Sequence, residues 1–419
     1  GDVDGAIEQV ERVIAQRPAD LTLRERLVGL ATQAGAWPRV ARELREIARL
    51  RATPGDRAKD ELRLGRVTRD HLGDAEEALA AFERGRQLDP LHLDLLREQV
   101  ELAARGRPAA RAELLARGVD DFRRAIDASP TSVALYDRLA TVHGWAGDRD
   151  GQWLALVALE ALGAPGPDQR KLIATGRERP ASAPSRQLLD PAARAALRAA
   201  GAGGVAGELW KALAPAVTAS LAIDPAKLGF VRGDRVAMKA LGKKYEALGA
   251  ALAAVGVDDV ELYVSEGRQG QARVLSGETP IVCCGADVAA GATAAARFAL
   301  GRAAWLASEG AAALLELNDA QVAWFVIAGL KVAGVPVPPA LAARVAGDEA
   351  AIAERTRLID KHLARRDKKL VVALAPRIGE LGDLTAGRAA MLASSQRAGL
   401  WLGGDLGVAL AALDVGRGG

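Results

Sequence analysis

Cysteine and aromatic residues are scarce in this sequence. Only two of its 419 residues are cysteine and 4% are aromatic, whereas 50% are hydrophobic. Two cysteines cannot build a disulfide framework. Alanine and leucine must therefore supply most of the buried surface, which favours helices packed closely through small side chains. A chain of this length is too long for one ordinary core, so we expect two or three domains.

The two cysteines are adjacent, at Cys283 and Cys284. Neighbouring residues of a strand point to opposite faces, so both sulfurs cannot easily bind one metal ion. We interpret them as small residues of a buried strand, and a redox or metal-binding role is the alternative.

Long hydrophobic runs are missing as well. The most apolar segment, 320–335, is shorter than the roughly 20 residues that a membrane-spanning helix needs, and Lys331 lies inside it. We expect a core helix there and no transmembrane segment. No signal peptide opens the chain, and Gly1 falls in the middle of a repeat, which indicates a fragment of a longer protein. The expected location is cytoplasmic.

Neither sign of charge is in excess: 56 basic residues face 53 acidic ones, for a formal net charge of +3. The sequence has no long basic run and no interleaving of arginine with aromatic residues, so nucleic acid is not an expected partner. We interpret the basic cluster at 365–369 as a solvated helix end. A patch for phosphate or an acidic partner is the alternative.

Histidine occurs only four times. His71, His92 and His143 are scattered along expected amphipathic helices, where single histidines are usually surface groups or satisfied core groups. The glycine-rich patches at 201–204 and 403–404 lack the lysine and hydroxyl of a phosphate-binding loop, so we interpret them as helix ends. The sequence therefore predicts no metal and no cofactor.

Prolines recur in the first half of the chain at a nearly constant spacing. They stand at positions 18, 54, 90, 130 and 165, each after a helical run. A period of about 34 to 40 residues with two amphipathic helices per unit is typical of a helical solenoid. The clearest unit is 73–90. There Gly73 allows a turn, Ala78 permits close helix approach, and Phe82 fills the core between helices.

These offsets resemble the tetratricopeptide repeat, over residues 1 to 165. The resemblance implies a superhelix whose concave face binds peptides or partner helices, so protein partners are expected. An array that serves only as a spacer or an assembly surface is the alternative.

A segment without apolar periodicity follows the repeats. We expect the repeat domain at 1–175, a linker at 176–189, connecting helices at 190–226 and an α+β domain at 227–419. Asp190 and Pro191 form a helix start, with the cap followed by proline at the first helical position.

The last domain mixes helices with short strands. Helical spacing covers 238–255, strands are indicated at 260–264, 271–275 and 280–284, and a buried helix is expected at 295–307.

This order of elements resembles a zinc metallopeptidase of the CAAX-prenyl-protease type, over residues 227 to 415. The helix centre 298–302 (Phe-Ala-Leu-Gly-Arg) occupies the frame of that family's His-Glu-x-x-His. The run 394–400 resembles the segment that supplies the third zinc ligand. The expected fold is mainly α: an N-terminal α-helical solenoid of tetratricopeptide-like repeats, then an α+β zincin-like domain with a small sheet.

Every chemical group of that motif is replaced in this sequence. The first histidine position holds Phe298, the glutamate position Ala299, and the second histidine position Arg302, a permanent cation that would repel Zn²⁺. The third-ligand glutamate falls at Leu392, and the aspartate of the run at Gln396. Zinc catalysis needs three protein ligands, an open position and a base, so the resemblance implies a domain without metal or catalysis.

The sequence therefore predicts a protein that is not an enzyme: an interaction scaffold made of a repeat array and a pseudo-peptidase domain. The alternative is a hydrolase with unconventional residues, in which Asp383, His362 or Cys283 has been recruited. A third possibility is that the C-terminal fold merely caps the solenoid. An edge strand beside the helix at 295–307, over a cleft, would favour the peptidase-like arrangement.

Overall fold

The chain divides into two compact units, Gly1–Arg179 and Pro180–Gly419. The computed structural model describes residues 3–105, 108–163, 165–178 and 187–415. Most of the predicted linker at 176–189 lies outside these residues. Its first two positions, Gly176 and Arg177, are instead the last turn of a helix.

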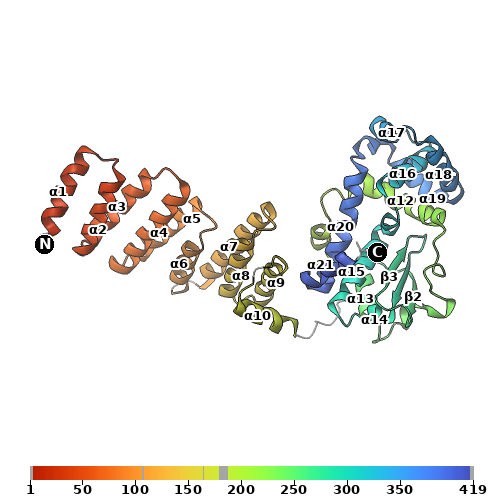
Figure 1. Ribbon diagram of the computed structural model, residues 1–419, viewed down its shortest axis with the longest axis horizontal. Coiled ribbons are helices and arrows are strands. Elements are labelled where there is room, and N and C mark those ends of the chain that lie inside the picture. Colours follow the sequence, from red (N-terminus) through yellow and green to blue (C-terminus); the bar gives the residue numbers. More distant parts are fainter. Residues whose placement is uncertain (1–2, 106–107, 164, 179–186, 416–419) are drawn as a thin grey trace. The chain divides into compact units, whose positions relative to one another are not determined.

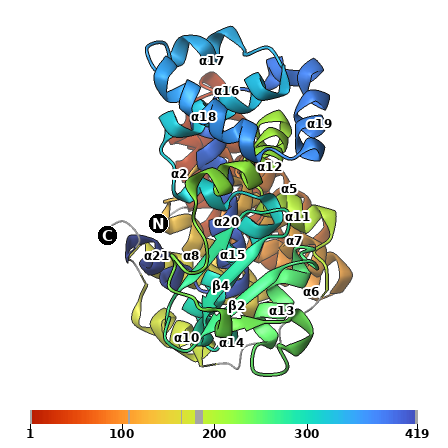
Figure 2. The same cartoon turned by 90° about the vertical axis from the view of Figure 1, so that its right-hand side faces the viewer.

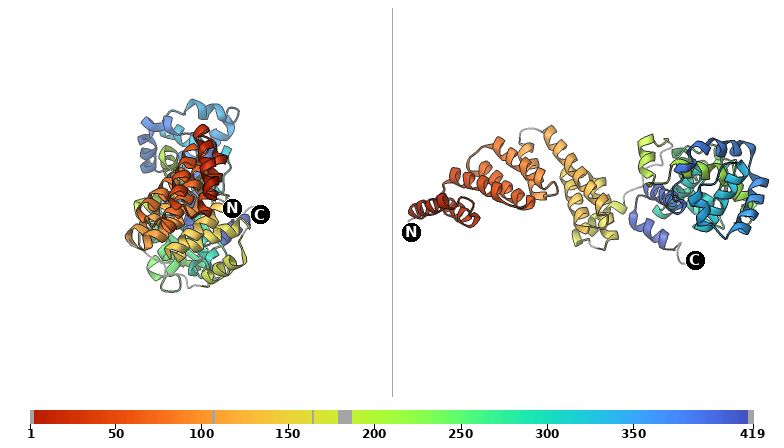
Figure 3. Two further views of the ribbon diagram at one scale, coloured as in Figure 1. Left: turned by 90° about the vertical axis from the view of Figure 1, so that its left-hand side faces the viewer. Right: turned by 90° about the horizontal axis from the view of Figure 1, so that it is seen from above.

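The first unit is a row of helices in which each packs on the next (Figure 1; Figure 3, right). Its described helices are α1 (Val3–Gln16), α2 (Leu21–Gln33), α3 (Trp37–Leu50), α4 (Pro54–His71), α5 (Ala75–Leu88), α6 (Leu93–Ala104), α7 (Pro108–Ala128), α8 (Val133–Ala146), α9 (Arg149–Ala161) and α10 (Pro167–Arg177). This is the helical solenoid that the proline spacing predicts.

The periodic prolines lie at the junctions between helices, with one difference from the prediction. Pro54 does not end a helix but begins α4, and Thr53 caps that helix by accepting a hydrogen bond from the amide of Asp56. Proline suits this position because the first helical amide has no partner within the helix.

The helices of the repeat at 73–90 pack closely, as Ala78 and Phe82 predict. Ala78 and Phe82 are both completely buried. Phe82 packs against Gly65 of α4, where a Cβ atom would lie 2.2 Å from the ring. Glycine at this position is what allows the phenylalanine to sit between the helices, and the sequence pattern did not reveal it.

Ion pairs join neighbouring repeats along two rows of helices. The row of odd-numbered helices carries Glu11–Arg42 (3.2 Å), Arg45–Glu77 (3.3 Å) and Arg86–Asp121 (2.6 Å). The row of even-numbered helices carries Glu25–Arg63 (3.0 Å) and Arg66–Glu98 (2.7 Å). Each pair links a helix to the equivalent helix of the next repeat.

The second unit combines a small sheet with many helices. Its described elements are α11 (Pro191–Leu197), α12 (Gly204–Leu221), η1 (Arg232–Asp234), β1 (Arg235–Val236), η2 (Met238–Ala240), α13 (Glu246–Ala254), β2 (Glu261–Ser265), β3 (Ala272–Leu275), β4 (Ile281–Gly285), α14 (Ala286–Ala290), α15 (Ala294–Glu309), η3 (Ala312–Leu315), α16 (Asp319–Ala333), α17 (Pro339–Arg344), α18 (Glu349–His362), α19 (Arg365–Ala373), η4 (Ala375–Glu380), α20 (Leu384–Gly403) and α21 (Leu406–Val415).

The three predicted strands are present within a residue or two of their expected bounds, and β1 adds a fourth. The sheet order is β1-β2-β4-β3, with β2 parallel to β4 and the other neighbours antiparallel. β3 therefore lies at an edge. The helix expected at 238–255 is shorter than predicted, because the left-handed backbone at Gly242 (φ +56°) separates η2 from α13.

Two hydrophobic cores lie among the described residues of this unit. One lies among helices, with Trp210 of α12 and Phe325 of α16, and the other lies between the sheet and α13 to α15, with Val282 and Trp305. Figure 2 shows the helical group around α16 to α19 at one end and the sheet at the other, with α20 running between them. The apolar segment 320–335 is the core helix α16, and no helix in the described residues has the length and apolarity to cross a bilayer.

Candidate functional site: the cleft between β3 and α15

Helix α15 is positioned by both of its ends and by its apolar faces. The Thr293 hydroxyl accepts a hydrogen bond from the amide of Ala296 (3.1 Å), and Gly310 ends the helix in the left-handed conformation (φ +65°). Phe298 and Trp305 are buried. The helix packs on the edge strand β3, and a cavity of about 620 Å³ lies between them.

The outer edge of β3, with which no strand of the described residues pairs, borders this cleft. The Gln271 carbonyl accepts a hydrogen bond from the amide of Gly285 (3.0 Å), and hydrogen-bonded pairs alternate with non-bonded ones along an antiparallel ladder. Ala272 and Val274 therefore direct their backbone N–H and C=O groups away from β4, and both residues line the cleft. Unpaired strand edges of this kind accept a further strand.

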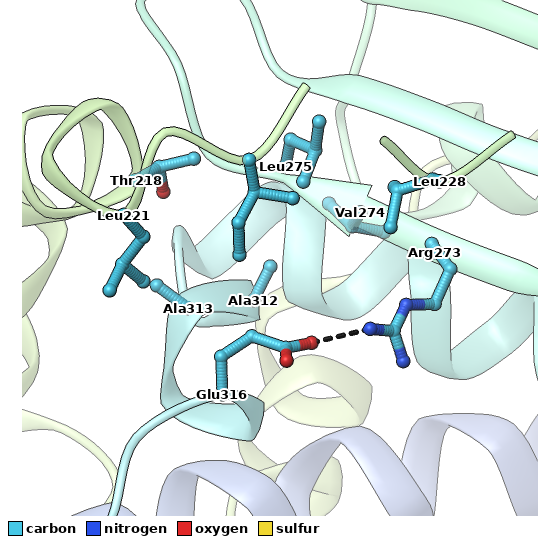
Figure 4. A pocket seen from close by; sticks show the side chains of 10 residues that line it. Thr218, Leu221, Leu228, Arg273, Val274, Leu275, Ala312, Ala313 and Glu316 are labelled. Atoms are coloured by element: carbon cyan, nitrogen blue, oxygen red, sulfur yellow. Dashed lines mark hydrogen bonds and ion pairs between the residues drawn. The ribbon is translucent and has the colours of Figure 1, made fainter. Parts of the chain in front are cut away.

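Small apolar side chains form most of the cleft wall. Four charged residues also contribute to it, from β3, α14, α15 and the segment after η3: Arg273, Asp287, Arg302 and Glu316. Figure 4 shows Arg273 and Glu316 pointing toward one another, at 2.6 Å. The neighbouring cavity drawn there is only about 10 Å³, room for no more than one water molecule.

Three of these four charged groups have a partner. Arg273 and Glu316 neutralise each other, and the Asp287 carboxylate accepts a hydrogen bond from the amide of Gly270 (2.9 Å). Arg302 differs. Its Nε is buried and has no hydrogen-bond partner in the described residues. Burial lowers the pKa of its guanidinium, which lies 5.8 Å from the centroid of the Phe298 ring.

Helix α20 packs against α15 through a glycine contact. A Cβ atom on Gly301 would lie 2.5 Å from the carbonyl oxygen of Ala398, and one on Gly399 would lie 2.7 Å from Cγ of Arg302. The two helices can approach this closely only because glycine stands at both positions. This contact fixes where Phe298 and Arg302 stand relative to the cleft.

The structure brings together three of the four degenerate peptidase-like positions. Phe298, Ala299 and Arg302 all line the cleft. Leu392 does not, because it packs against the helical core on α20. A ring, a methyl group and a cation do not suit a zinc ion, whose ligands are imidazole, thiolate or carboxylate.

The residues considered for an unconventional hydrolase do not line this cleft. Cys283 is completely buried, and burial raises the pKa of its thiol to about 12. Asp383 caps α20 and pairs with Arg344 (2.5 Å), and its pKa is lowered mainly by the amide of Thr385. His362 lies in the last turn of α18. Among the described residues, no three His, Cys, Asp or Glu side chains gather in a way that could hold a metal ion.

Two histidines of the first unit have local partners of their own. His143 is buried with its Nδ1 2.8 Å from the Asp148 carboxylate, and burial lowers its pKa. The His71 ring stacks on Trp37 with centroids 3.5 Å apart. Neither arrangement resembles a shared site.

A second hollow lies in the first unit, between α5 and α7 over the end of α6. Its volume is about 890 Å³. Leu79, Leu102 and Leu114 contribute apolar surface, and charged side chains of both signs surround them. The sequence predicts a binding face on the solenoid without locating it. This groove is one of several hollows in the described part of the first unit, and it is larger than the two lined mainly by residues of α5, α7 and α8.

Comparison with known proteins does not assign the chain to a family. No family model and no curated protein matches it. Two crystal structures of MamA are similar at 16% identity and cover 42% and 43% of this chain and 92% and 90% of their own, each with a TM-score of 0.25. PilW, a widely conserved type IV pilus biogenesis factor, is similar at 14% identity over 42% of this chain and 78% of its own, with a TM-score of 0.25. Similarities of this strength carry no argument about function.

Proposed function

We propose that this protein is a non-catalytic interaction scaffold. The solenoid, a tetratricopeptide-like array, binds partner peptides or helices, with the groove between α5 and α7 as its binding surface. The second unit is a pseudo-peptidase domain of zincin-like architecture, and its cleft is a docking surface for an extended segment of a partner.

One observation carries the proposal for the second unit. A free strand edge borders a cleft of about 620 Å³, and the positions of the His-Glu-x-x-His frame that line it hold Phe298, Ala299 and Arg302. The edge can bind an extended chain through its backbone. The side chains at these three frame positions offer no carboxylate, imidazole or thiolate to act as a base, a nucleophile or a metal ligand.

The test is a selection of displayed peptides on the whole chain. Ala299→Trp fills the cleft, and Ala80→Trp fills the groove of the first unit, since each alanine lines its cavity. We expect two classes of peptide, each lost with one of the two substitutions. Ala353→Trp, on an exposed face of α18, is the matched control and should lose neither class.

Two results would contradict the proposal. If neither Ala299→Trp nor Ala80→Trp affects peptide binding, the proposed docking role is wrong. Stoichiometric zinc binding at sub-micromolar affinity, measured by titration of the purified protein, removes the non-catalytic assignment.

A further inference from the structure

We propose that Arg302 makes the cleft selective for an extended peptide that carries an acidic side chain. This inference rests on the docking role proposed above, and adds the chemistry of the partner. It starts from the one charged group of the cleft that has no partner in the described residues.

Arg302 is half-buried, and its Nε is fully buried without a hydrogen-bond partner in the described residues. No described carboxylate or carbonyl accepts a hydrogen bond from Arg302, and Phe298 and Gly399 flank its side chain. Burying a charge without a partner is unfavourable. A carboxylate supplied from outside would offset this, because the planar guanidinium fork matches the two oxygens of a carboxylate.

The other polar groups of the cleft select the form of the partner. Ala272 and Val274 offer backbone N–H and C=O groups that only another backbone satisfies in both directions. A chain paired along β3 alternates its side chains between the two faces of the sheet. Every second side chain is then directed toward α15, the helix that carries Arg302.

The remaining charges of the cleft do not compete for this role. Arg273 is held by Glu316 and Asp287 by the Gly270 amide. Among the described residues of the cleft, Arg302 is therefore the cation left to meet an acidic side chain. The apolar walls around it strengthen the attraction by excluding water.

The experiment uses a random hexapeptide library with acetylated N-termini and amidated C-termini, so that side chains carry all carboxylates. The full chain, Arg302→Gln and Arg357→Gln are screened in parallel; Arg357 is an exposed arginine of α18 and provides the matched control. We expect Asp and Glu to be enriched at one peptide position with the unchanged chain and the control, and not with Arg302→Gln. Replacing that acid by its amide should weaken binding to the unchanged chain about tenfold or more, and should not weaken binding to Arg302→Gln.

The outcomes separate this inference from the docking role. Peptides that are lost with Ala299→Trp but show no acid enrichment overturn the inference and leave the docking role standing. Absence of any peptide lost with Ala299→Trp contradicts the docking role itself. A second library has free C-termini and no acidic side chains. If only this library yields ligands that depend on Arg302, the cation binds a terminal carboxylate, and the proposed acidic side chain is wrong.

A stability measurement excludes a merely structural role for Arg302. If the side chain only packs the cleft, Arg302→Met lowers the Tm. If the unpaired cation serves binding, Arg302→Met leaves the Tm at or above that of the unchanged chain. A selected acidic peptide should raise the Tm of the unchanged chain but not that of Arg302→Met.

Discussion

The two units of this protein bring helices together in different ways. In the solenoid, glycine makes room for the end of a large side chain: Gly65 faces the Phe82 ring. Between α15 and α20, glycine makes room for backbone: Gly301 faces the carbonyl of Ala398, and Gly403 faces that of Ala294. A clash with the Phe82 ring involves one side chain, whereas a clash with the Ala398 carbonyl can be relieved only by moving the helix that carries it.

The difference suits the use that we propose for each unit. Repeats linked by ion pairs and adjustable side chains form a row in which each helix depends on its neighbours. A backbone contact between α15 and α20 holds one face of the cleft in place. The stability of the solenoid should therefore depend mainly on its charged pairs. The stability of the α15–α20 contact should depend mainly on side-chain volume.

The largest effect should come from breaking the buried ion pair of the solenoid. Arg24 and Glu43 lie 2.5 Å apart and are 8% and 4% exposed. Glu43→Ala leaves the Arg24 guanidinium buried without this carboxylate, so we expect a loss of about 3–5 kcal/mol. Hydrogen exchange should locate the loss in α1 to α3.

Two further variants control this result. Glu46→Ala removes an exposed partner of Arg49 on the same helix and should cost less than about 1 kcal/mol. Replacing both members, with Arg24→Met and Glu43→Leu, should restore most of the stability, since no unpaired charge remains. If the double variant is as unstable as Glu43→Ala, the buried charge is not the cause.

The second-largest loss of stability should come from adding a methyl group between α15 and α20. A Cβ atom on Gly301 would lie 2.5 Å from the Ala398 carbonyl oxygen and 2.9 Å from Cα of Gly399. Gly301→Ala must separate the two helices, and we expect a loss of about 1–3 kcal/mol or more. Chemical denaturation measures it, and loss of cleft-dependent peptide binding should accompany it.

The same substitution in the solenoid should have the opposite sign. Gly29 lies on an exposed face of α2, and a methyl group added there would meet no atom within 4 Å. Gly29→Ala should stabilise the unit by up to about 1 kcal/mol, because alanine favours a helix. Equal effects of the two substitutions would mean that helix propensity, and not close packing, decides the outcome in α15.

The sequence revealed the elements better than their contacts. Prolines and Phe82 predicted the solenoid because a local period carries that information. Alternating apolar residues located β2, and short runs at hairpin-like distances from it located β3 and β4. Local patterns do not show that β4 lies between β2 and β3, which is what leaves β3 at an edge. That order results from pairing between residues distant in the chain.

The candidate site was predicted as a set of missing groups. The frame around Phe298 and Arg302 could be seen in the sequence, but the missing partner of Arg302 could not, because it depends on every element around the cleft. Leu392 was aligned with a ligand position, yet the packing of α20 places it, partly buried, against the helical core. The Gly301–Ala398 contact joins residues almost a hundred positions apart, and a glycine in an alanine-rich helix gives no signal of it.

Lowering the pH should destabilise the solenoid more than the second unit. The pKa of Glu25 is lowered mainly by the hydrogen bond from Arg63, and that of Glu98 is lowered because hydrogen bonds from Arg69 and Arg66 outweigh its burial. Since the folded-state pKa lies below the unfolded value, this stabilisation is present above about pH 4.5 and is lost as the pH falls through the folded pKa. We expect protection of α2 to α6 from hydrogen exchange to fall between about pH 5 and about pH 3.

The corresponding control is the second half of α20, around Ala398 and Gly399, whose contact with α15 is made by glycine and backbone. The first turn is left out of the comparison because Asp383, whose pKa is lowered, caps it. Protection of the second half should change less over the same range, and Glu98→Gln should reduce the pH dependence of α4 and α6. A parallel decline of α20 and the solenoid would show that the units do not differ in their dependence on charge.

The smallest effect tests whether the exposed pairs of the solenoid contribute at all. Arg45 of α3 and Glu77 of α5 lie 3.3 Å apart, with side chains 49% and 31% exposed. A double-mutant cycle with Arg45→Ala and Glu77→Ala should give a coupling of no more than about 1 kcal/mol, which decreases in high salt. Arg84 also contacts Glu77, so the cycle isolates the Arg45 contribution only if Arg84 is kept in all four proteins. A coupling of zero would mean that buried ion pairs and apolar contacts such as Phe82 on Gly65 hold the repeats together. The dependence of stability on charge would then come from buried carboxylates such as Glu43 and Glu98.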